Sequence, residues 1–259
     1  MSDNDINFND DQLLHYSRQI MLPHFGIEGQ QQLHDAHVVV IGVGGLGSPA
    51  ALYLAAAGVG SLTLVDFDKV DNSNLQRQII HNTNSIGNSK VNSAKESLLA
   101  INPETNVHCI DKQLSFDELI PLVKDVSCVI DATDNFSTRF LINRACVSEK
   151  IALISAAAIQ YEGQISVFDL RQKESACYAC LYNDGGEEES TNCSENGILA
   201  PVFGILGSMQ ALEAIKIICN IGETLQNRLL VFDALALQWR TLKLNKDPAC
   251  PVCGQSSYK

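Results

Sequence analysis

The feature that most constrains the fold is a glycine-rich hexapeptide, Gly42-Val43-Gly44-Gly45-Leu46-Gly47. The β-branched run His37–Ile41 precedes it and predicts a strand, while Gly47–Ala57 follows it and predicts a helix that ends before Gly58. Residues 61–66 predict the next strand. Together these segments predict a βαβ unit with a right-handed crossover, which is the beginning of a doubly wound α/β sheet.

The alternation of strand and helix patterns continues along the chain. Lys90–Ile101 is an amphipathic helical pattern that stops at Asn102-Pro103. The next predicted elements are a strand over 127–131, a helix over Phe136–Glu149 and strands over 151–155, 164–169, 229–233 and 238–244. The last three strands are separated by turns. We therefore expect a Rossmann-like, mostly parallel sheet extended by antiparallel strands.

The length of 259 residues fits one α/β domain over residues 1–259. Within it we expect a helical arm over residues 1–35 and a nucleotide-binding half over 36–158. The remaining part, 159–259, should hold the antiparallel extension, a long polar loop over 183–196 and a cysteine-rich tail.

Charge and hydropathy exclude two classes of partner. Thirty acidic and eighteen basic residues give a net charge of −12, which opposes general attraction to nucleic acid or to anionic membranes. The apolar stretch 197–222 is long enough to span a bilayer, but Gln210, Glu213 and Lys216 lie within it, so it predicts a buried core or interface helix. Residues 1–11 are polar and acidic, unlike a signal peptide, and predict a cytoplasmic protein.

The glycine turn predicts a nucleotide site. Glycines let backbone N–H groups approach phosphate at a helix N-terminus, and Asp66 at the end of the next strand can accept hydrogen bonds from ribose. The candidate phosphate-contacting glycines are Gly42, Gly44, Gly45 and Gly47. An NAD-dependent oxidoreductase would use the same fingerprint with the same acid, and close helix–strand packing alone also requires glycines.

Polar and cationic residues beyond Asp66 favour a triphosphate over a nicotinamide cofactor. They are Asp68, the run from Ser73 to Arg77, and Lys90 at the start of a helix. A triphosphate needs such cations because charge on the attacked phosphorus and on departing pyrophosphate must be neutralised. Asp134, just after a predicted strand, is placed to hold magnesium.

These motifs resemble the ThiF/MoeB/HesA group, the bacterial relatives of ubiquitin-activating enzymes. The resemblance covers Leu13 to Gly254 and rests on the glycine turn together with Tyr16-Ser17-Arg18-Gln19-Ile20, Asp66-Phe67-Asp68, Asn74-Leu75-Gln76-Arg77-Gln78, Lys90, Asp131-Ala132-Thr133-Asp134-Asn135 and two CxxC motifs. It implies contacts to ATP or its magnesium from Gly45, Asp66, Ser73, Asn74, Leu75, Gln76, Arg77, Lys90, Asp134 and Asn135. It also implies that Arg18 reaches the neighbouring active site across a homodimer interface.

The resemblance implies an adenylyltransferase, in which the C-terminal glycine carboxylate of a small ubiquitin-like sulfur carrier, ending in Gly-Gly, attacks the α-phosphate of ATP. The carrier can belong to molybdopterin or thiamine biosynthesis. The chain ends soon after its second CxxC, so we expect sulfur from an external donor enzyme. A noncatalytic nucleotide-binding scaffold remains an alternative, although Arg77, Lys90 and Asp134 speak against it.

Cysteines supply the strongest metal signal. Cys177 and Cys180 form one CxxC pair, and Cys250 and Cys253 form a second, which is the ligand set of a closed tetrahedral zinc site. Two redox-active dithiols are the alternative, but neither pair follows a βαβ start. Cys193 lies in the polar loop; it is a candidate for attack on an acyl-adenylate or a plain loop cysteine. The remaining cysteines, Cys109, Cys128, Cys146 and Cys219, are interpreted as core residues.

Overall fold

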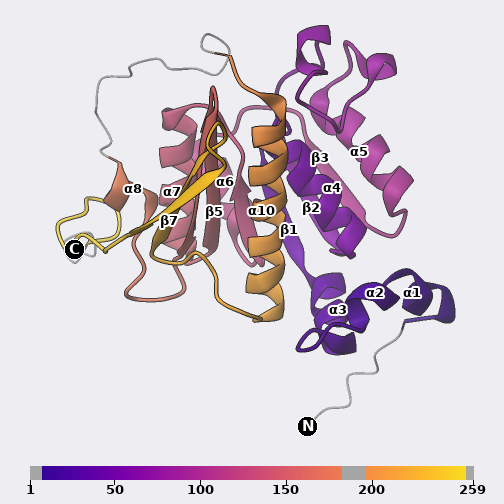
Figure 1. Cartoon of the computed structure of the whole chain (residues 1–259), viewed down its shortest axis with the longest axis horizontal. Helices are drawn as coiled ribbons and strands as arrows, with labels where there is room; N and C mark the ends of the chain where they lie inside the picture. Colours follow the sequence, from indigo (N-terminus) through magenta and orange to yellow (C-terminus); the bar gives the residue numbers. More distant parts are fainter. Residues whose placement is uncertain (1–7, 183–196, 255–259) are drawn as a thin grey trace.

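A computed structural model of the chain describes residues 8–182 and 197–254 (Figure 1). Its centre is one eight-stranded sheet with the strand order β3-β2-β1-β4-β5-β6-β7-β8. The first five strands are parallel and are β1 His37–Ile41, β2 Ser61–Val65, β3 Asn106–Ile110, β4 Cys128–Asp131 and β5 Ala152–Ile159. The antiparallel strands are β6 Glu162–Asp169, β7 Arg228–Asp233 and β8 Gln238–Lys243. The expected parallel sheet with an antiparallel extension is confirmed.

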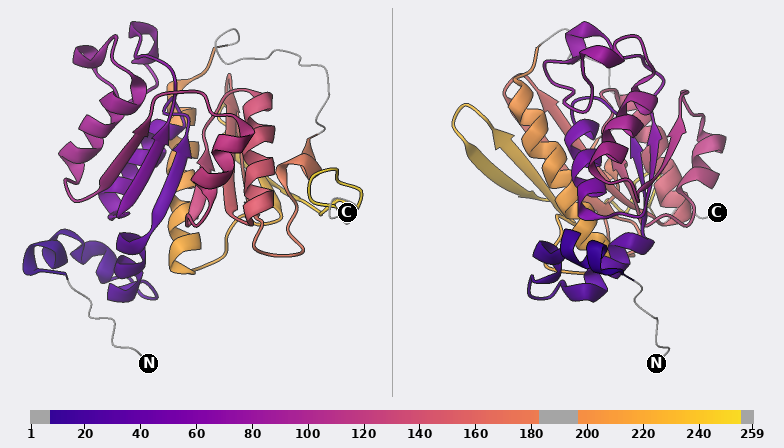
Figure 2. Two further views of the ribbon diagram at one scale, coloured as in Figure 1. Left: turned by 180° about the vertical axis from the view of Figure 1, so that it is seen from behind. Right: turned by 90° about the vertical axis from the view of Figure 1, so that its right-hand side faces the viewer.

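Helices cover both faces of the sheet, so the molecule has three layers (Figure 2). One face packs against α4 Gly47–Ala57, α5 Lys90–Ile101 and α10 Ala200–Cys219, and the other against α6 Phe116–Val123 and α7 Phe136–Glu149. Alternate residues of β1 pack on opposite faces of the sheet. Val38 and Val40 belong to the core beneath α4, α5 and α10, and Val39 and Ile41 belong to the core beneath α6 and α7. This is the two-residue side-chain period of a strand buried on both faces.

Shorter elements complete the described chain. The N-terminal arm holds α1 Asp10–His15, α2 Ser17–Ile20 and α3 Gly26–Asp35. Two 3₁₀ turns, η1 Asn72–Asn74 and η2 Thr83–Ser85, follow β2, and α8 Tyr178–Leu181 follows β6. The arm lies at the end of the sheet where β1 begins, opposite the carboxyl ends of the parallel strands (Figure 1).

The predicted helices Gly47–Ala57, Lys90–Ile101 and Phe136–Glu149 have the bounds found in the structure. Besides the short elements η1, η2 and α8, strand β3 and helix α6 were not predicted. Strand β3 lies at the sheet edge, and Val107 is its only buried residue, so it has no continuous apolar run. Helix α6 contains Pro121, which usually ends a helix.

Strand β5 extends four residues beyond the predicted end at Ser155, because its second half pairs with β6 in a hairpin that turns at Gln160 and Tyr161. Alanines at 156–158 carry little β-propensity, so tertiary pairing decides this segment.

Helix α10 is the one helix of the described chain that is long and apolar enough to span a membrane. It packs against α4 and against strands β4 to β6, as expected for a core helix. The Gln210 amide nitrogen donates to the carbonyl oxygens of Asp131 and Ile154 at 2.8 and 3.2 Å, and buried Glu213 accepts from Lys216 and from the backbone N–H of Leu225, whereas Gln210 Oε1 has no partner among the described residues. The charged and amide groups of this helix therefore stabilise the core.

Candidate active site

A cavity of about 420 Å³ lies at the carboxyl ends of the parallel strands. Its walls come from the segments that directly follow β1, β2, β3 and β4, with further residues from β5, β6 and α7. Strand order reverses between β1 and β4, and such a switch point is where open α/β sheets bind their ligands. The fold therefore creates this cavity where the glycine turn lies.

The glycine turn is compact because Gly42 and Gly47 lie so close to other backbone atoms that neither position has room for a side chain. Gly42 has a φ of +90°, and a Cβ there would lie 2.7 Å from the carbonyl oxygen of Ala132. A Cβ on Gly47 would lie 1.9 Å from the carbonyl oxygen of Gly42. Gly44 differs, because it lines the cavity and a Cβ there would meet nothing closer than the Gln78 amide at 3.5 Å.

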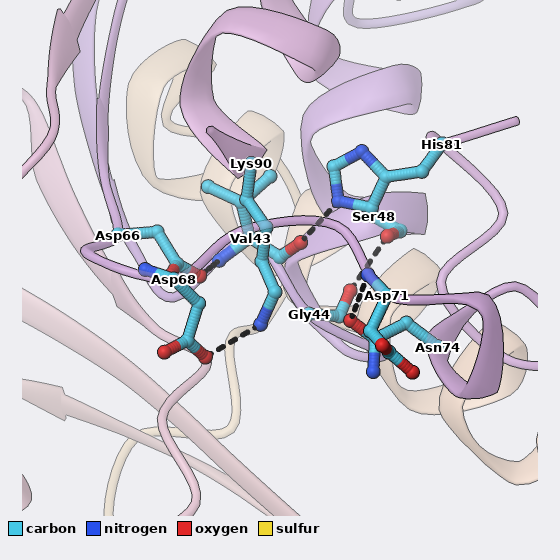
Figure 3. A network of polar contacts seen from close by, with 9 residues as sticks. All are labelled: Val43, Gly44, Ser48, Asp66, Asp68, Asp71, Asn74, His81 and Lys90. Carbon is cyan, nitrogen blue, oxygen red and sulfur yellow. Dashed lines mark hydrogen bonds and ion pairs between the residues drawn. The ribbon is translucent and has the colours of Figure 1, made fainter. Parts of the chain in front are cut away.

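Asp66 holds the turn in place (Figure 3). Its Oδ2 accepts a hydrogen bond from the Val43 backbone N–H at 2.8 Å, and its Oδ1 accepts from the Asp68 N–H at 2.9 Å. Burial raises the pKa of this carboxyl, while Lys90 and these N–H groups act in the opposite direction. From the other side, His81 contacts the carbonyl oxygen of Val43 at 3.1 Å. Both backbone polar groups of Val43, its N–H and its carbonyl oxygen, are thus held by side chains.

Predicted cationic residues converge on the cavity. Lys90 is 6% exposed, and its Nζ forms an ion pair with Asp68 Oδ2 at 2.7 Å (Figure 3). Arg77 lines the cavity and donates from Nη1 to the carbonyl oxygen of Ser73 at 2.9 Å. Asp134, which is exposed, also lines the cavity beside the glycine turn. These three groups therefore surround the same space.

Asn135 lines the cavity too and caps α7: its Oδ1 accepts from the Thr138 N–H at 2.9 Å. The predicted residues that line the cavity are Gly42, Gly44, Gly45, Asp66, Asp68, Arg77, Lys90, Asp134 and Asn135.

The remaining predicted residues do not line this cavity. Ser73, Asn74, Leu75 and Gln76 form and follow the turn η1, where the Ser73 hydroxyl and the Asn74 amide bond with Asp71. Gly47 lies beneath the turn as the first residue of α4. Arg18 is on α2 in the N-terminal arm, at the far end of the sheet. Cys193 lies outside the described residues.

Sequence reasoning missed two cations in the cavity wall, Lys112 and Arg139, and three amides, Gln78, Gln113 and Gln164. Arg139 is 7% exposed and donates to the carbonyl oxygen of Thr133. Gln78 is 5% exposed, and its amide oxygen has no hydrogen-bond partner among the described residues. The signal for Arg139 was its position one turn after the cap Asn135, which directs it back toward the strand end.

The two CxxC pairs meet in space. Sulfur atoms lie 3.7 Å apart between Cys177 and Cys250, 3.4 Å between Cys180 and Cys253, and 4.0 Å between Cys177 and Cys180. All four lie within 4.8 Å of one another. Four thiolates bound to one zinc at about 2.3 Å would lie about 3.8 Å apart, whereas a disulfide requires about 2.05 Å. The donor set therefore fits a tetrahedral metal and fits no disulfide.

Backbone and side-chain donors support the sulfurs. The Asn143 amide nitrogen lies 3.7 Å from Cys177 Sγ, and the backbone N–H of Asp247 donates to Cys180 Sγ at 3.4 Å. Such donors are typical of the surroundings of structural metal thiolates.

Residues 16–252 match the sequence profile of the ThiF family. Proteins of Salmonella typhimurium and Escherichia coli named molybdopterin-synthase adenylyltransferase are 46% and 44% identical over 247 residues, which cover 95% of this chain and 98% of each relative. A Drosophila yakuba protein named adenylyltransferase and sulfurtransferase MOCS3 is 42% identical over 95% of this chain and 54% of its own length.

The fold is also found in solved structures. A crystal structure of Escherichia coli MccB with ATP is 24% identical, has a TM-score of 0.82, and aligns with 97% of this chain and 75% of that one. This likeness concerns the arrangement of strands and helices.

Proposed function

The chain belongs to the ThiF family and is an adenylyltransferase, and we propose that it activates the C-terminal glycine carboxylate of a small ubiquitin-like sulfur carrier with ATP. The observation that carries the proposal is the convergence of Arg77, Lys90 and Asp134 on one cavity beside the glycine turn. Binding of a nicotinamide cofactor does not require two cations and a metal-binding carboxylate at this position. A triphosphate requires them because its phosphate charges must be neutralised.

The proposed reaction needs no protein nucleophile. A carboxylate oxygen of the carrier attacks the α-phosphorus of ATP, the bond from that phosphorus to the bridging oxygen breaks, and pyrophosphate leaves with the electron pair. Because the carboxylate is already ionised at neutral pH, catalysis consists of alignment and charge neutralisation. Lys90 and Arg77 neutralise phosphate oxygens, the backbone N–H groups at Gly44 and Gly45 approach phosphate, and Asp66 accepts from ribose.

Magnesium is the metal we assign to Asp134, whose exposed carboxylate lies in the cavity. Carboxylate oxygens with nucleotide phosphates are the usual ligands of this ion, and bound magnesium supplies further neutralisation of phosphate charge. Asn135 is placed beside it, but its side-chain oxygen already caps α7. Ser73, Asn74, Leu75 and Gln76 remain proposed contacts, although they do not line the cavity.

Zinc is the metal we assign to the four cysteines, on the basis of their sulfur spacing and the all-thiolate donor set. A closed site of four thiolates has no open position for substrate, so its contribution is structural. It ties the C-terminal tail to the segment after β6, which are 73 residues apart in sequence.

The relatives' names favour a carrier of molybdopterin synthase over a thiamine carrier. We further propose a cytoplasmic homodimer served by a separate sulfur donor enzyme. The family resemblance assigns Arg18 to a nucleotide site, and this residue lies on α2 at the end of the sheet remote from its own cavity, so a second copy would have to supply it (Figure 1).

Carrier-dependent exchange of labelled pyrophosphate into ATP tests this function. Lys90→Ala and Asp134→Ala should abolish exchange and leave the chain folded, since Asp68, the ion-pair partner of Lys90, is half-exposed and Asp66 keeps its two backbone N–H donors. Lys95→Ala, on the same helix but outside the cavity wall, is the matched control and should exchange normally.

Retained exchange in both variants would remove these residues from the mechanism. If the unaltered protein catalyses no exchange with either a molybdopterin carrier or a thiamine carrier, the proposed substrate class is wrong. Nicotinamide absorbance in the purified protein would identify an oxidoreductase instead.

A further inference from the structure

Tyr178 belongs to two sites at once. It lies between Cys177 and Cys180 in the first CxxC pair, and it also lines the nucleotide cavity. The residue is 2% exposed, so it forms a wall between the cysteine cluster and the cavity. Neither residue between the cysteines of the second pair, Pro251 or Val252, lines the cavity.

Aromatic packing fixes the Tyr178 ring. Its centroid lies 5.3 Å from that of Phe140 and 6.0 Å from that of Phe168, in both cases edge to face, and 4.7 Å from that of Tyr182. These neighbours come from α7, β6 and the end of α8. The ring therefore cannot move without repacking three elements around it, because interiors of this density have few alternative arrangements.

Helix α7 connects the cysteine cluster to the cavity through two residues one turn apart. Asn143 accepts a hydrogen bond at Oδ1 from the Tyr178 backbone N–H at 2.9 Å, and its amide nitrogen lies 3.7 Å from Cys177 Sγ. Arg139, four residues earlier, interacts electrostatically with the Tyr178 side chain and lines the same cavity, while the Tyr178 hydroxyl has no hydrogen-bond partner among the described residues. Residues four apart share one face of a helix, so both can meet the cysteine-bearing segment.

Arg139 continues the connection to Asp134. Its guanidinium donates to the carbonyl oxygen of Thr133, and on the other side of this turn buried Asp131 accepts from the Thr133 N–H at 3.1 Å and from the Thr133 hydroxyl at 2.7 Å. The turn that presents Asp134 is therefore held between Asp131 and Arg139. A guanidinium that is 7% exposed can stay in place only while its surroundings are packed.

We propose that Tyr178 is a positioning residue that couples the four-cysteine cluster to the nucleotide cavity, because its ring holds Arg139 against the turn that presents Asp134. In this arrangement the metal-bound cysteines fix Tyr178, Tyr178 confines Arg139, and Arg139 sets the place of Asp134. Loss of metal or of the ring relaxes the same turn. This proposal rests on the proposed function, since it assumes that ATP and magnesium bind in the cavity.

The test measures the dissociation constant of ATP by calorimetry on the full chain without carrier, across a series of magnesium concentrations. Tyr178→Ala should keep its bound metal, counted with a colorimetric zinc indicator, and its fold, checked by circular dichroism. It should weaken magnesium-dependent ATP binding by about fivefold or more, the lower end of typical couplings between sites. Binding of ATP without magnesium should weaken less, because Tyr178 lines the cavity but the displaced turn carries the proposed magnesium ligand Asp134.

Val252→Ala is the matched control, since it removes a side chain from the other CxxC pair without touching the cavity wall; it should bind ATP as the unaltered protein does. Metal stripping with a chelator, followed by dialysis and return of magnesium, should weaken binding in the unaltered protein but add little in Tyr178→Ala. If stripped protein unfolds, the comparison of the metal-loaded variants decides the question alone.

Equal magnesium-dependent binding in metal-loaded Tyr178→Ala and the unaltered protein would overturn the coupling. So would an equal loss of ATP binding with and without magnesium, or metal stripping and ring removal having fully additive effects. Failure of the unaltered protein to bind ATP at all would instead contradict the proposed function, so the two failures are distinguishable.

Discussion

Gly47→Ala probes how the glycine turn closes on itself. The new Cβ would lie 1.9 Å from the carbonyl oxygen of Gly42, whereas ordinary contacts begin at 3.4 Å, so the two backbone segments must separate by about 1.5 Å, the difference between these distances. The obstacle is a backbone atom held by its neighbours, because the Gly42 N–H donates to the carbonyl oxygen of Val65 at 2.8 Å. No side chain can rotate away to relieve this clash.

Overpacking in a protein interior costs about 1–3 kcal/mol, and with backbone on both sides we expect about 3 kcal/mol for this variant. For a chain of this size each kcal/mol lowers the melting temperature by about 2–4 °C, so Gly47→Ala should melt about 6–12 °C lower in differential scanning calorimetry. An unchanged melting temperature would refute the argument that the turn is closed by contact between these two glycines.

Gly44→Ala is the informative companion. A Cβ at this position meets nothing closer than 3.5 Å, so the variant should fold with nearly unchanged stability. Gly44 nevertheless lines the cavity, and a methyl group there occupies space that phosphate needs beside the backbone N–H groups. We expect a stable protein with weakened ATP binding in calorimetry. Full ATP affinity in Gly44→Ala would show that phosphate does not approach this part of the turn.

Two further predictions concern the arm and a buried histidine. Arg18→Ala should be inactive alone, and mixing it with Lys90→Ala should restore part of the pyrophosphate exchange if Arg18 acts in the partner's cavity; verified mixed dimers without restored exchange would contradict that placement. Burial lowers the pKa of His81 below its ordinary value of 6.5, so stability should be lost as pH falls from 6.5 toward the lower folded value, because the unfolded chain takes up the proton first. His81→Gln should flatten that part of the urea-unfolding profile, and an identical pH dependence would count against a neutral buried ring.

The sequence predicted those parts of the fold and the cavity in which local signals agree with tertiary packing. Short-range sequence patterns predicted the glycine turn from Gly42 to Gly47, the strand and helix around it, and the cluster of four cysteines. In each case local propensity and tertiary packing favour the same structure. Lys90 and Asp134 were found because each follows or begins a recognisable element at the carboxyl edge of the sheet.

What was missed depends on contacts between distant segments. Lys112 follows β3, an edge strand without an apolar run, so neither the strand nor the lysine could be placed. Tyr178 resembles any residue between two cysteines until β6 and α7 bring it to the cavity wall. Ser73 to Gln76 show the reverse case: they were predicted as a contiguous group of contacts, yet in the folded chain only their neighbour Arg77 lines the cavity.

In the unliganded protein the ion pair between Lys90 and Asp68 gives each of these two side chains a counterion. A lysine side chain that is 8% exposed would be costly as a lone charge, and half-exposed Asp68 compensates it. Nucleotide entry is then an exchange of counterions: a phosphate displaces a carboxylate, which returns to water. A ligand with a single negative charge gains little from that exchange, while a polyphosphate brings several charges to the same ammonium group. We therefore expect the ion pair to make the cavity bind highly charged ligands more tightly than singly charged ones.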